Sequence, residues 1–341
     1  MKKLIKKIFL VLILAFTGLI FGQLALADSN DFSVIPVLPE NQNPDIPSYF
    51  DLTVTPRQQQ TLPVKIKNNS DENVKYKIYV NTATTNQNGI IDYSISDFEI
   101  DESMKLSIKD CITVNEPLVE VPANSEKDVS LELNIPETPF EGIALGGITV
   151  EPIAEEGNDG VNNLFTRTLA IQIAESTTAI SPELYGGNVL ISQENLRNNI
   201  KFELRNSTPT IISKVKAEIA ITKKGDQQPI IEQTKEQLSF APNSKFNLMT
   251  EWNGQFEPGK YVYTINLKDD AGNQWEFDKE FEIRSEEAEK LNETSVDEKR
   301  RFIKAYFSYI VIFLLIFIGG LIWAVLRKNK NNKVNSTKNS N

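Results

Sequence analysis

The side chains on which enzymes most often rely are scarce in this sequence. The chain of 341 residues contains no histidine, so it has no Ser-His or Cys-His pair, no histidine base and no histidine metal ligand. One Ser-x-x-Lys, from Ser213 to Lys216, has the spacing of penicillin-binding transpeptidases. It begins a predicted strand rather than a helix, and neither Ser-Asp-Asn nor Lys-Thr-Gly occurs elsewhere, so we interpret the spacing as a coincidence.

The single cysteine, Cys111, excludes an intramolecular disulfide. An exported chain without disulfides must obtain its stability from the size of its hydrophobic cores. The alternation from Leu106 to Ile112 leaves open whether the thiol is buried. Because a nucleophilic cysteine usually needs a basic neighbour, we expect a structural thiol rather than a catalytic or redox one.

The acidic side chains offer two other kinds of chemistry. The run Asp269-Asp270-Ala271-Gly272-Asn273 could give oxygen ligands to calcium, but it lacks the ligand number and the bidentate acid of an EF-hand loop, so we predict a hairpin turn. A carboxylate pair for glycoside cleavage stays open, because its two acids need not be close in sequence. We expect no catalytic residue, no metal and no cofactor.

Both ends of the chain carry membrane signals. Four lysines, an apolar run from Ile8 to Phe16 and Ala25-Leu26-Ala27 predict a signal peptide over residues 1–27, cleaved between Ala27 and Asp28, with an uncleaved anchor as the alternative. Residues 306–326 carry no charge and are long enough to cross the bilayer as one helix. The basic tail, residues 327–341, is then cytoplasmic. We expect a single-pass cell-membrane protein whose body lies outside the cell.

The charge balance limits the partners. The chain has 36 basic and 46 acidic residues, and the basic residues of the two terminal segments make its exported body more acidic still. Such a surface repels a phosphate backbone, so we expect no nucleic acid partner. Whether the acidic surface binds calcium stays open.

Short alternating segments between Phe32 and Ile283 predict an all-β body. Turn sequences recur as well: Asn68-Asn69-Ser70 resembles Asn206-Ser207, and Pro122-Ala123-Asn124-Ser125 resembles Ala241-Pro242-Asn243-Ser244. We therefore predict two tandem immunoglobulin-like β-sandwich domains, followed by the C-terminal transmembrane helix. The predicted strands are 49–55, 62–67, 74–80, 129–135, 147–150, 200–204, 215–221, 261–267, 275–277 and 281–283.

Polar and charged stretches mark the domain limits. Residues 28–153 form the first predicted sandwich and residues 164–284 the second. Residues 154–163, which include Glu155-Glu156-Gly157-Asn158-Asp159-Gly160, are a linker or a long loop inside a hairpin. Residues 285–305 are charged and predict a mostly helical stalk before the membrane.

With little catalytic chemistry available, binding is the remaining class of function. Aromatic faces pack on sugar rings and amides bond sugar hydroxyls, so we take Tyr49, Phe50, Asn86, Asn88 and Tyr93 as candidate contact residues. Each could equally be a core aromatic or an ordinary loop residue. Edge strands of a sandwich could also accept a strand from a partner.

Each predicted domain also carries a series of short motifs in a fixed order. The first carries Phe32-Ser33-Val34, Pro39-Glu40-Asn41-Gln42, Tyr49-Phe50-Asp51-Leu52, Leu62 to Asn68, Asn81 to Asn86, Ile91 to Ser94 and Gly146-Gly147-Ile148-Thr149. The second carries Ile221 to Gly225, Ala241 to Phe246, Gly259-Lys260-Tyr261 and Trp275 to Phe281. The joint order of these motifs resembles one family, the WxL-interacting proteins of Gram-positive bacteria. One departure is Arg57, which stands after Pro56 where such sequences usually place Gly; a type I turn would tolerate Arg there.

The resemblance implies a first domain that binds peptidoglycan and a second that binds host proteins, including host matrix proteins, with WxL-domain surface proteins as further partners. We therefore expect a non-enzymatic, membrane-tethered adhesion adaptor. Two alternatives stay open: a cell-wall hydrolase or transpeptidase, and an assembly subunit or chaperone that acts by strand donation. The resemblance assigns no contact residues.

Overall fold

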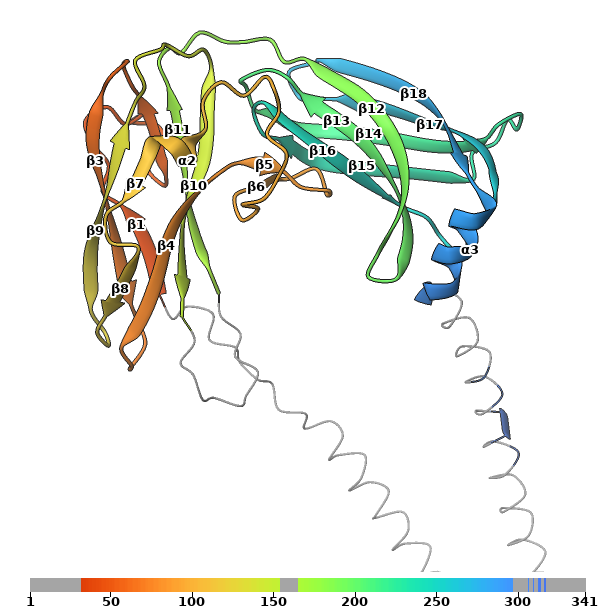
Figure 1. Ribbon diagram of the computed structural model, residues 1–341, viewed down its shortest axis with the longest axis horizontal. Helices are drawn as coiled ribbons and strands as arrows, with labels where there is room; N and C mark the ends of the chain where they lie inside the picture. The colour runs from red at the N-terminus through yellow and green to blue at the C-terminus, as the bar shows by residue number, and fades with distance from the viewer. Residues whose placement is uncertain are drawn as a thin grey trace, which may run out of the picture.

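Two β-sandwiches lie side by side and make up most of the chain (Figure 1). The computed structural model describes residues 32–153 and 165–296, and five helical, exposed residues of the C-terminal segment: Tyr306, Tyr309, Ile312, Phe313 and Ile316. The predicted signal peptide, its cleavage site at Ala27 and Asp28, the cytoplasmic tail and most of the predicted transmembrane helix lie outside the described residues. Within the described part, every helix falls short of the length and apolarity that a membrane crossing requires.

The first sandwich packs a four-stranded sheet, β1-β3-β9-β7, on a five-stranded sheet, β2-β11-β10-β4-β8. Strands pair antiparallel except β2 and β11, which are parallel. The strands are β1 (Phe32–Pro36), β2 (Phe50–Thr53), β3 (Gln59–Asn68), β4 (Val74–Thr82), β7 (Ile112–Val114), β8 (Leu118–Val121), β9 (Glu126–Asn134), β10 (Ile143–Pro152) and β11 (Arg167–Ala174). A separate two-residue pair, β5 (Thr84–Thr85) and β6 (Ile91–Asp92), extends away from this sandwich toward the second one (Figure 1).

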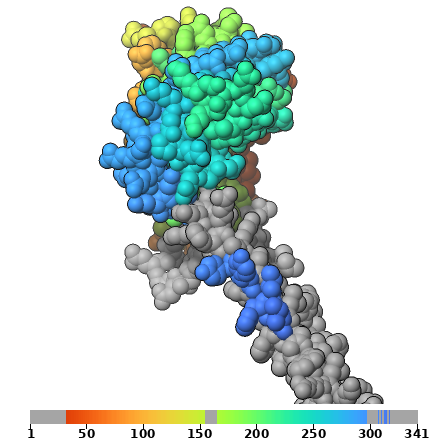
Figure 2. Space-filling view, turned by 90° about the vertical axis from the view of Figure 1, so that its right-hand side faces the viewer, coloured from red at the N-terminus to blue at the C-terminus, as the bar shows by residue number. Residues whose placement is uncertain are grey.

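The second sandwich packs a three-stranded sheet, β12-β13-β16, on a four-stranded sheet, β15-β14-β17-β18. Viewed from its free end, the second sandwich, coloured green to blue, lies in front of the first (Figure 2). The strands are β12 (Leu184–Glu194), β13 (Arg197–Asn206), β14 (Ile212–Lys223), β15 (Ile231–Phe240), β16 (Ser244–Glu251), β17 (Gly259–Lys268) and β18 (Gln274–Ile283). The all-β prediction is confirmed, and the predicted turn at Asp269 to Asn273 joins β17 to β18.

Residues 154–163, predicted as a linker or as a long loop inside a hairpin, lie outside the described residues, and the strands on either side of them favour the loop. β10 and β11 are antiparallel neighbours, so the connection between Pro152 and Arg167 is the loop of a hairpin. β11 also pairs with β2, and its residues Leu169, Ile171 and Ile173 are buried in the first core. The first sandwich therefore extends to Ala174, because a polar run in the sequence marks a loop without saying whether the next strand returns to the same sheet.

Each sandwich has its own core, built from the inward residues of alternating strands. In β3, for example, Leu62, Val64 and Ile66 are buried while Thr61, Lys65 and Lys67 are less so. Aromatic side chains dominate the second core, where Phe202 stacks on Tyr263 and Trp252 meets Tyr261 edge on. These cores supply the stability that disulfides provide in smaller exported domains.

The turn sequences that recur in the two halves have the same structure. Asn68 and Asn206 end β3 and β13, both side chains are fully buried, and each amide donates to two or more backbone carbonyls. Each side-chain oxygen accepts from a residue two positions later, Ser70 or Thr208. Asn124 and Asn243 occupy the matching second turns at φ 50° and 49°. The two sandwiches thus use one buried asparagine each to hold two turns together.

Two shorter segments resolve local details. Residues Ile108–Cys111 form a single helical turn, α2, and the Cys111 thiol, whose burial the sequence left open, is buried in the first core. Arg57 has φ 64° and follows Pro56, and Gln58 N–H donates to Thr55 O, so this turn is type II rather than type I. Gly would be favoured at that left-handed position; here Arg57 is exposed and pairs with Glu137.

The predicted stalk at residues 285–305 is helical at its start but is docked on the second sandwich. Helix α3 (Ser285–Thr294) buries Ala288 in the second core. The Asn292 side chain accepts from Phe256 N–H at 2.8 Å and donates to Phe256 O at 2.9 Å. Beyond the helix, Val296 N–H donates to Leu196 O. The second sandwich therefore extends at least to residue 296.

Replacing the buried turn asparagine of the second sandwich should destabilise the protein. Asn206→Ala leaves the carbonyls of Thr210 and Ala241 and the N–H of Thr208 without their partner, so we expect a loss of about 2–3 kcal/mol in the free energy of unfolding. Urea denaturation of the full chain in mild detergent measures this. The control Asn134→Ala removes an exposed amide and should change stability by less than about 0.5 kcal/mol; equal effects would contradict the prediction.

Cys111 should resist thiol reagents while the protein is folded. The thiol is buried, and burial together with nearby Asp110 raises its pKa to about 11. Because the unfolded chain loses this proton near pH 9, stability should decrease as the pH rises from about 9 to 11. We expect no maleimide labelling at pH 8 in buffer and complete labelling in urea. Rapid labelling of the folded protein would show that the thiol is accessible.

Candidate binding site

The candidates Tyr49 and Phe50 differ in burial, although both contact the first core. Phe50 is fully buried in the first core, so its ring is not available to a ligand. Tyr49 is half-buried at the edge of that core, just before β2. Burial, with Asp51 nearby, raises the pKa of its hydroxyl, so it stays protonated and can donate a hydrogen bond at neutral pH.

The candidates Asn86, Asn88 and Tyr93 belong to a segment that leaves the first sandwich and contacts the second. We call residues 83–107 the interdomain arm. Asn86 Oδ1 accepts hydrogen bonds from the backbone N–H of Asn88 and Ile90, and its Nδ2 donates to Asp92. The Asn86 amide therefore stabilises the turn between β5 and β6. Asn88 is exposed at the tip of that turn.

Tyr93 lies over the outer face of the five-stranded sheet. A Cβ added at Gly147 of β10 would stand only 2.7 Å from the Cβ of Tyr93 and 2.6 Å from Thr168, so this position has no room for a side chain. Burial, followed by the nearby Tyr49, raises the pKa of the Tyr93 hydroxyl. The structure thus brings Tyr49 and Tyr93 together, although 43 other residues separate them in the sequence.

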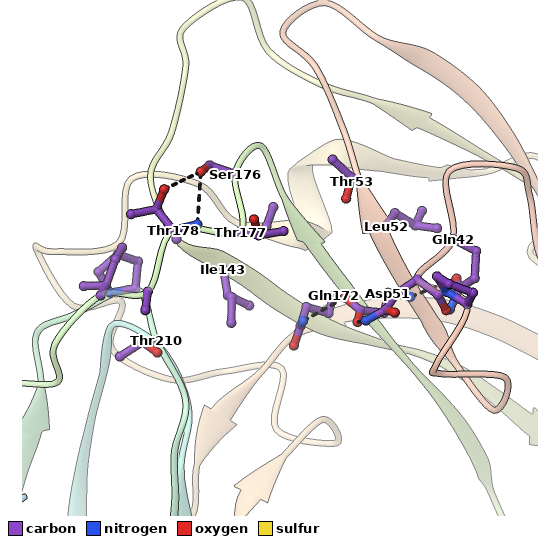
Figure 3. A pocket seen from close by; sticks show the side chains of 17 residues that line it. Gln42, Asp51, Leu52, Thr53, Ile143, Gln172, Ser176, Thr177, Thr178 and Thr210 are labelled. Atoms are coloured by element: carbon purple, nitrogen blue, oxygen red, sulfur yellow. Dashed lines mark hydrogen bonds between the residues drawn. The ribbon is translucent and has the colours of Figure 1, made fainter. Parts of the chain in front are cut away.

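A polar cleft of about 500 Å³ lies at the junction of the two sandwiches (Figure 3). Its walls come from the loop before β2, from β2 and β11, from the connector after β11, and from Pro209 and Thr210 of the second sandwich. In Figure 3, hydroxyls of Ser176, Thr177 and Thr178 lie on one side and Gln42 and Gln172 on the other, with Ile143 between them.

The amide side of the cleft is held rigidly by hydrogen bonds to Asp51. Gln172 Nε2 donates to one oxygen of the Asp51 carboxylate and Asn43 Nδ2 to the other, each at 2.8 Å. The Asp51 N–H donates in turn to Gln42 Oε1 at 3.0 Å. On the hydroxyl side, Ser176 and Thr178 bond each other at 2.8 Å. These side chains are therefore preorganised before any ligand arrives.

The lining suits a neutral polar ligand. Asp51 is the one charged residue among those that form the cleft, and amides occupy both of its oxygens. Amides and hydroxyls can each donate and accept, which matches sugar hydroxyls and N-acetyl groups. No group of three metal-ligating side chains occurs among the residues that the structure describes.

Sequence reasoning missed the cleft residues for an identifiable reason. Strand alternation puts Asp51 and Gln172 on the outward faces of their strands, but nothing in the sequence indicates that β2 and β11 are parallel neighbours. The five candidate residues do not line the cleft. Tyr49, which precedes Asp51, comes closest, since its carbonyl accepts from Gln42 Nε2.

The second sandwich has two shallower hollows on the outer face of its four-stranded sheet. They are about 450 and 380 Å³, lie side by side, and share Glu218 and Asn266. Lys216, Lys268 and Glu276 line the larger one, so charges of both signs meet there. Trp275, on the same strand as Glu276, packs instead against the second core. Complementary charges contribute to the recognition of partner proteins.

Solved structures offer only weak likenesses. The class 5 fimbriae chaperone CfaA is 15% identical, with 73% of this chain and 98% of that chain covered at a TM-score of 0.30. The Pseudomonas aeruginosa CupB2 chaperone is 13% identical, with 67% and 95% covered at 0.29. The E. coli chaperone DraB is 16% identical, with 66% and 90% covered at 0.25. Such TM-scores carry no argument about this chain.

Family models give a clear result, whereas no curated protein sequence matches significantly. The peptidoglycan binding domain of WxL Interacting Protein matches residues 32–152, and the host binding domain matches residues 156–293. The second match includes β11, which the structure places in the first sandwich. The two matches together span most of the chain in the order that the sequence motifs predicted, and the chain therefore belongs to the WxL-interacting protein family.

Proposed function

We propose that this protein is a non-enzymatic surface adaptor, tethered to the cell membrane, that binds peptidoglycan with its first sandwich and a partner protein with its second. The observation that carries the proposal is the consecutive match to two binding modules over residues 32–152 and 156–293. A surface binding role follows from these modules. Its location in the cell membrane rests on the signal peptide and the apolar segment 306–326 of the sequence.

We place the peptidoglycan contact at the junction cleft. Glycan strands of peptidoglycan present hydroxyls and N-acetyl amides, and the cleft offers Gln172, Ser176 and Thr210 within one hollow. Its volume of about 500 Å³ fits a ligand of disaccharide size. Tyr49 and Tyr93 lie near the Asp51 end and add aromatic surface there.

Two observations favour the adaptor over the two alternatives. Strand donation at the β2 edge would have to displace residues 41–43, since Asn43 N–H donates to Asp51 O and Thr53 N–H to Asn41 O. The two family modules are binding domains, which favours binding over hydrolysis or transpeptidation. We also assign both sandwiches to the immunoglobulin-like class, because their consecutive strands cross between the sheets in Greek-key order.

Removing the cleft amide should weaken binding to cell walls. Gln172→Ala removes a donor and acceptor from the lining and frees one oxygen of Asp51, so we expect about 10-fold weaker binding to purified sacculi, as for one or two lost hydrogen bonds. Co-sedimentation of the full chain with sacculi in mild detergent measures the affinity. The matched control Gln228→Ala, in an exposed turn between β14 and β15, should bind like the parent chain.

Unchanged sedimentation of Gln172→Ala would exclude the cleft as the wall-binding site. Release of soluble muropeptides from the same sacculi, abolished by replacing one carboxylate, would instead support the hydrolase alternative.

The second sandwich should capture a WxL-domain protein or a host matrix protein through its outer sheet. Lys268→Glu reverses an exposed charge in the larger hollow, and we expect about 10-fold weaker capture in a pull-down with the immobilised full chain. Sacculus binding should be unaffected, since Lys268 lies on a different sandwich from Gln172. Capture at the parent level would move the partner site elsewhere on the second sandwich.

A further inference from the structure

The interdomain arm completes the second sandwich by filling an open seam. β15 and β16 are edge strands of different sheets, and they follow each other along the chain. The turn between β5 and β6 enters between them: Ser239 N–H of β15 donates to Gly89 O, and Met249 N–H of β16 donates to Gln87 O, both at 2.8 Å. One turn of the first module thus satisfies backbone groups of both edges.

Side-chain packing at the arm tip leaves little freedom. Gly89 has φ 75°, and a Cβ added there would stand 3.1 Å from Leu248 and 3.2 Å from Leu238. Nearby, the Thr85 hydroxyl accepts from Ala241 N–H at 2.9 Å and bonds the Ser244 hydroxyl at 2.8 Å, in a fully buried position. Loss of this hydroxyl would leave a buried N–H without an acceptor.

The rest of the arm contacts side chains of β13 and β16 that point away from the second core. Arg205 Nη2 donates to Asp101 Oδ1 at 3.0 Å, and Arg205 Nε lies 2.6 Å from Asp101 Oδ2 in an ion pair. Burial alone would raise the pKa of Asp101, but hydrogen bonds from Ser103 and Arg205 outweigh it and hold the pKa below its usual range. Lys245 pairs with Glu99 at 3.1 Å. The arm therefore contacts β16 from both sides.

The same junction forms one wall of the cleft. Ile143 N–H donates to Pro209 O at 2.8 Å, and a Cβ added at Gly142, φ 70°, would meet that carbonyl at 2.2 Å. Ile143 also packs in a small core shared by the two sandwiches, with Ala83, Tyr93 and Ala241. Because Pro209 and Thr210 line the cleft, its shape depends on how closely the second sandwich is held against the first.

We propose that the junction cleft is a two-domain site: the second sandwich supplies Pro209 and Thr210 as one wall, and the interdomain arm holds that wall in place. The ligand class is a neutral glycan rich in hydroxyl and N-acetyl groups. This inference rests on the proposed peptidoglycan function of the cleft. It predicts that the family's first module, residues 32–152 alone, lacks β11, the connector and this wall, and so holds an incomplete site.

Two variants of the full chain in mild detergent test the proposal. Thr210→Val keeps the shape of a cleft-lining residue but removes its hydroxyl, and sacculus binding should fall about 3- to 10-fold. Thr85→Val loosens the arm from Ala241, so exchange of the Ser239 and Met249 amides should rise about 10-fold and sacculus binding should fall with it. Amides in the first core, such as Ile66, should exchange as in the parent.

The control Thr61→Val makes the same chemical change on an exposed strand, where the hydroxyl contacts only Glu132, and should alter neither readout. If Thr85→Val raises the exchange of both amides while sacculus binding stays at the parent level, the arm does not support the site. Parent-level binding by Thr210→Val would likewise overturn the two-domain assignment. The wall formed by the first sandwich is tested separately, because failure of Gln172→Ala to weaken binding would refute the cleft itself.

Discussion

The insertion of one turn between two edge strands is the interaction on which the arrangement of this protein depends. Gln87 and Gly89 accept hydrogen bonds from β16 and β15, which would otherwise leave a gap between the sheets of the second sandwich. Unpaired edges invite association with other chains, and covering them is a general way to prevent it. Here the cover comes from the neighbouring module, so the two sandwiches share contacts that neither has alone.

The same requirement explains two adjacent glycines in β10. Gly147 makes room for Tyr93 of the arm on one face of the strand, and Gly146 makes room for Ile108 of α2, just after the arm, on the other, where an added Cβ would stand 2.4 Å from that side chain. The family motif Gly146-Gly147-Ile148-Thr149 thus lets the arm and α2 pack closely on opposite faces of β10. Its chemistry is steric: it permits close approach rather than contacting a ligand.

The packing between the two sandwiches fixes the orientation of the cleft relative to the C-terminal end of the second sandwich. The proposed wall-binding cleft is bounded by both sandwiches, and helix α3 is docked on the second one. Packed elements therefore join the cleft to the end of the second sandwich at residue 296. If the chain is tethered as its sequence suggests, the cleft is held at a set orientation relative to the start of the tether. The buried asparagines at the ends of β3 and β13 stiffen the corresponding turns in each sandwich.

Periodicity in the sequence was sufficient to identify most of the long, regular strands, such as β3, β4, β14 and β17, because each buries every second residue in a large core. The recurring turn residues also predicted two similar sandwiches. β11 was not assigned to the first sandwich, and the contacts of the arm with the second sandwich were not predicted, because strand pairing and the path of a loop depend on contacts between residues far apart in the chain. Tyr49 and Tyr93 were recognised individually, whereas the cleft formed by Asp51, Gln172 and Thr210 was not. The sequence by itself determined the fold class and the family; only the tertiary structure decided which module completes the other, since that depends on the free edges that folding creates.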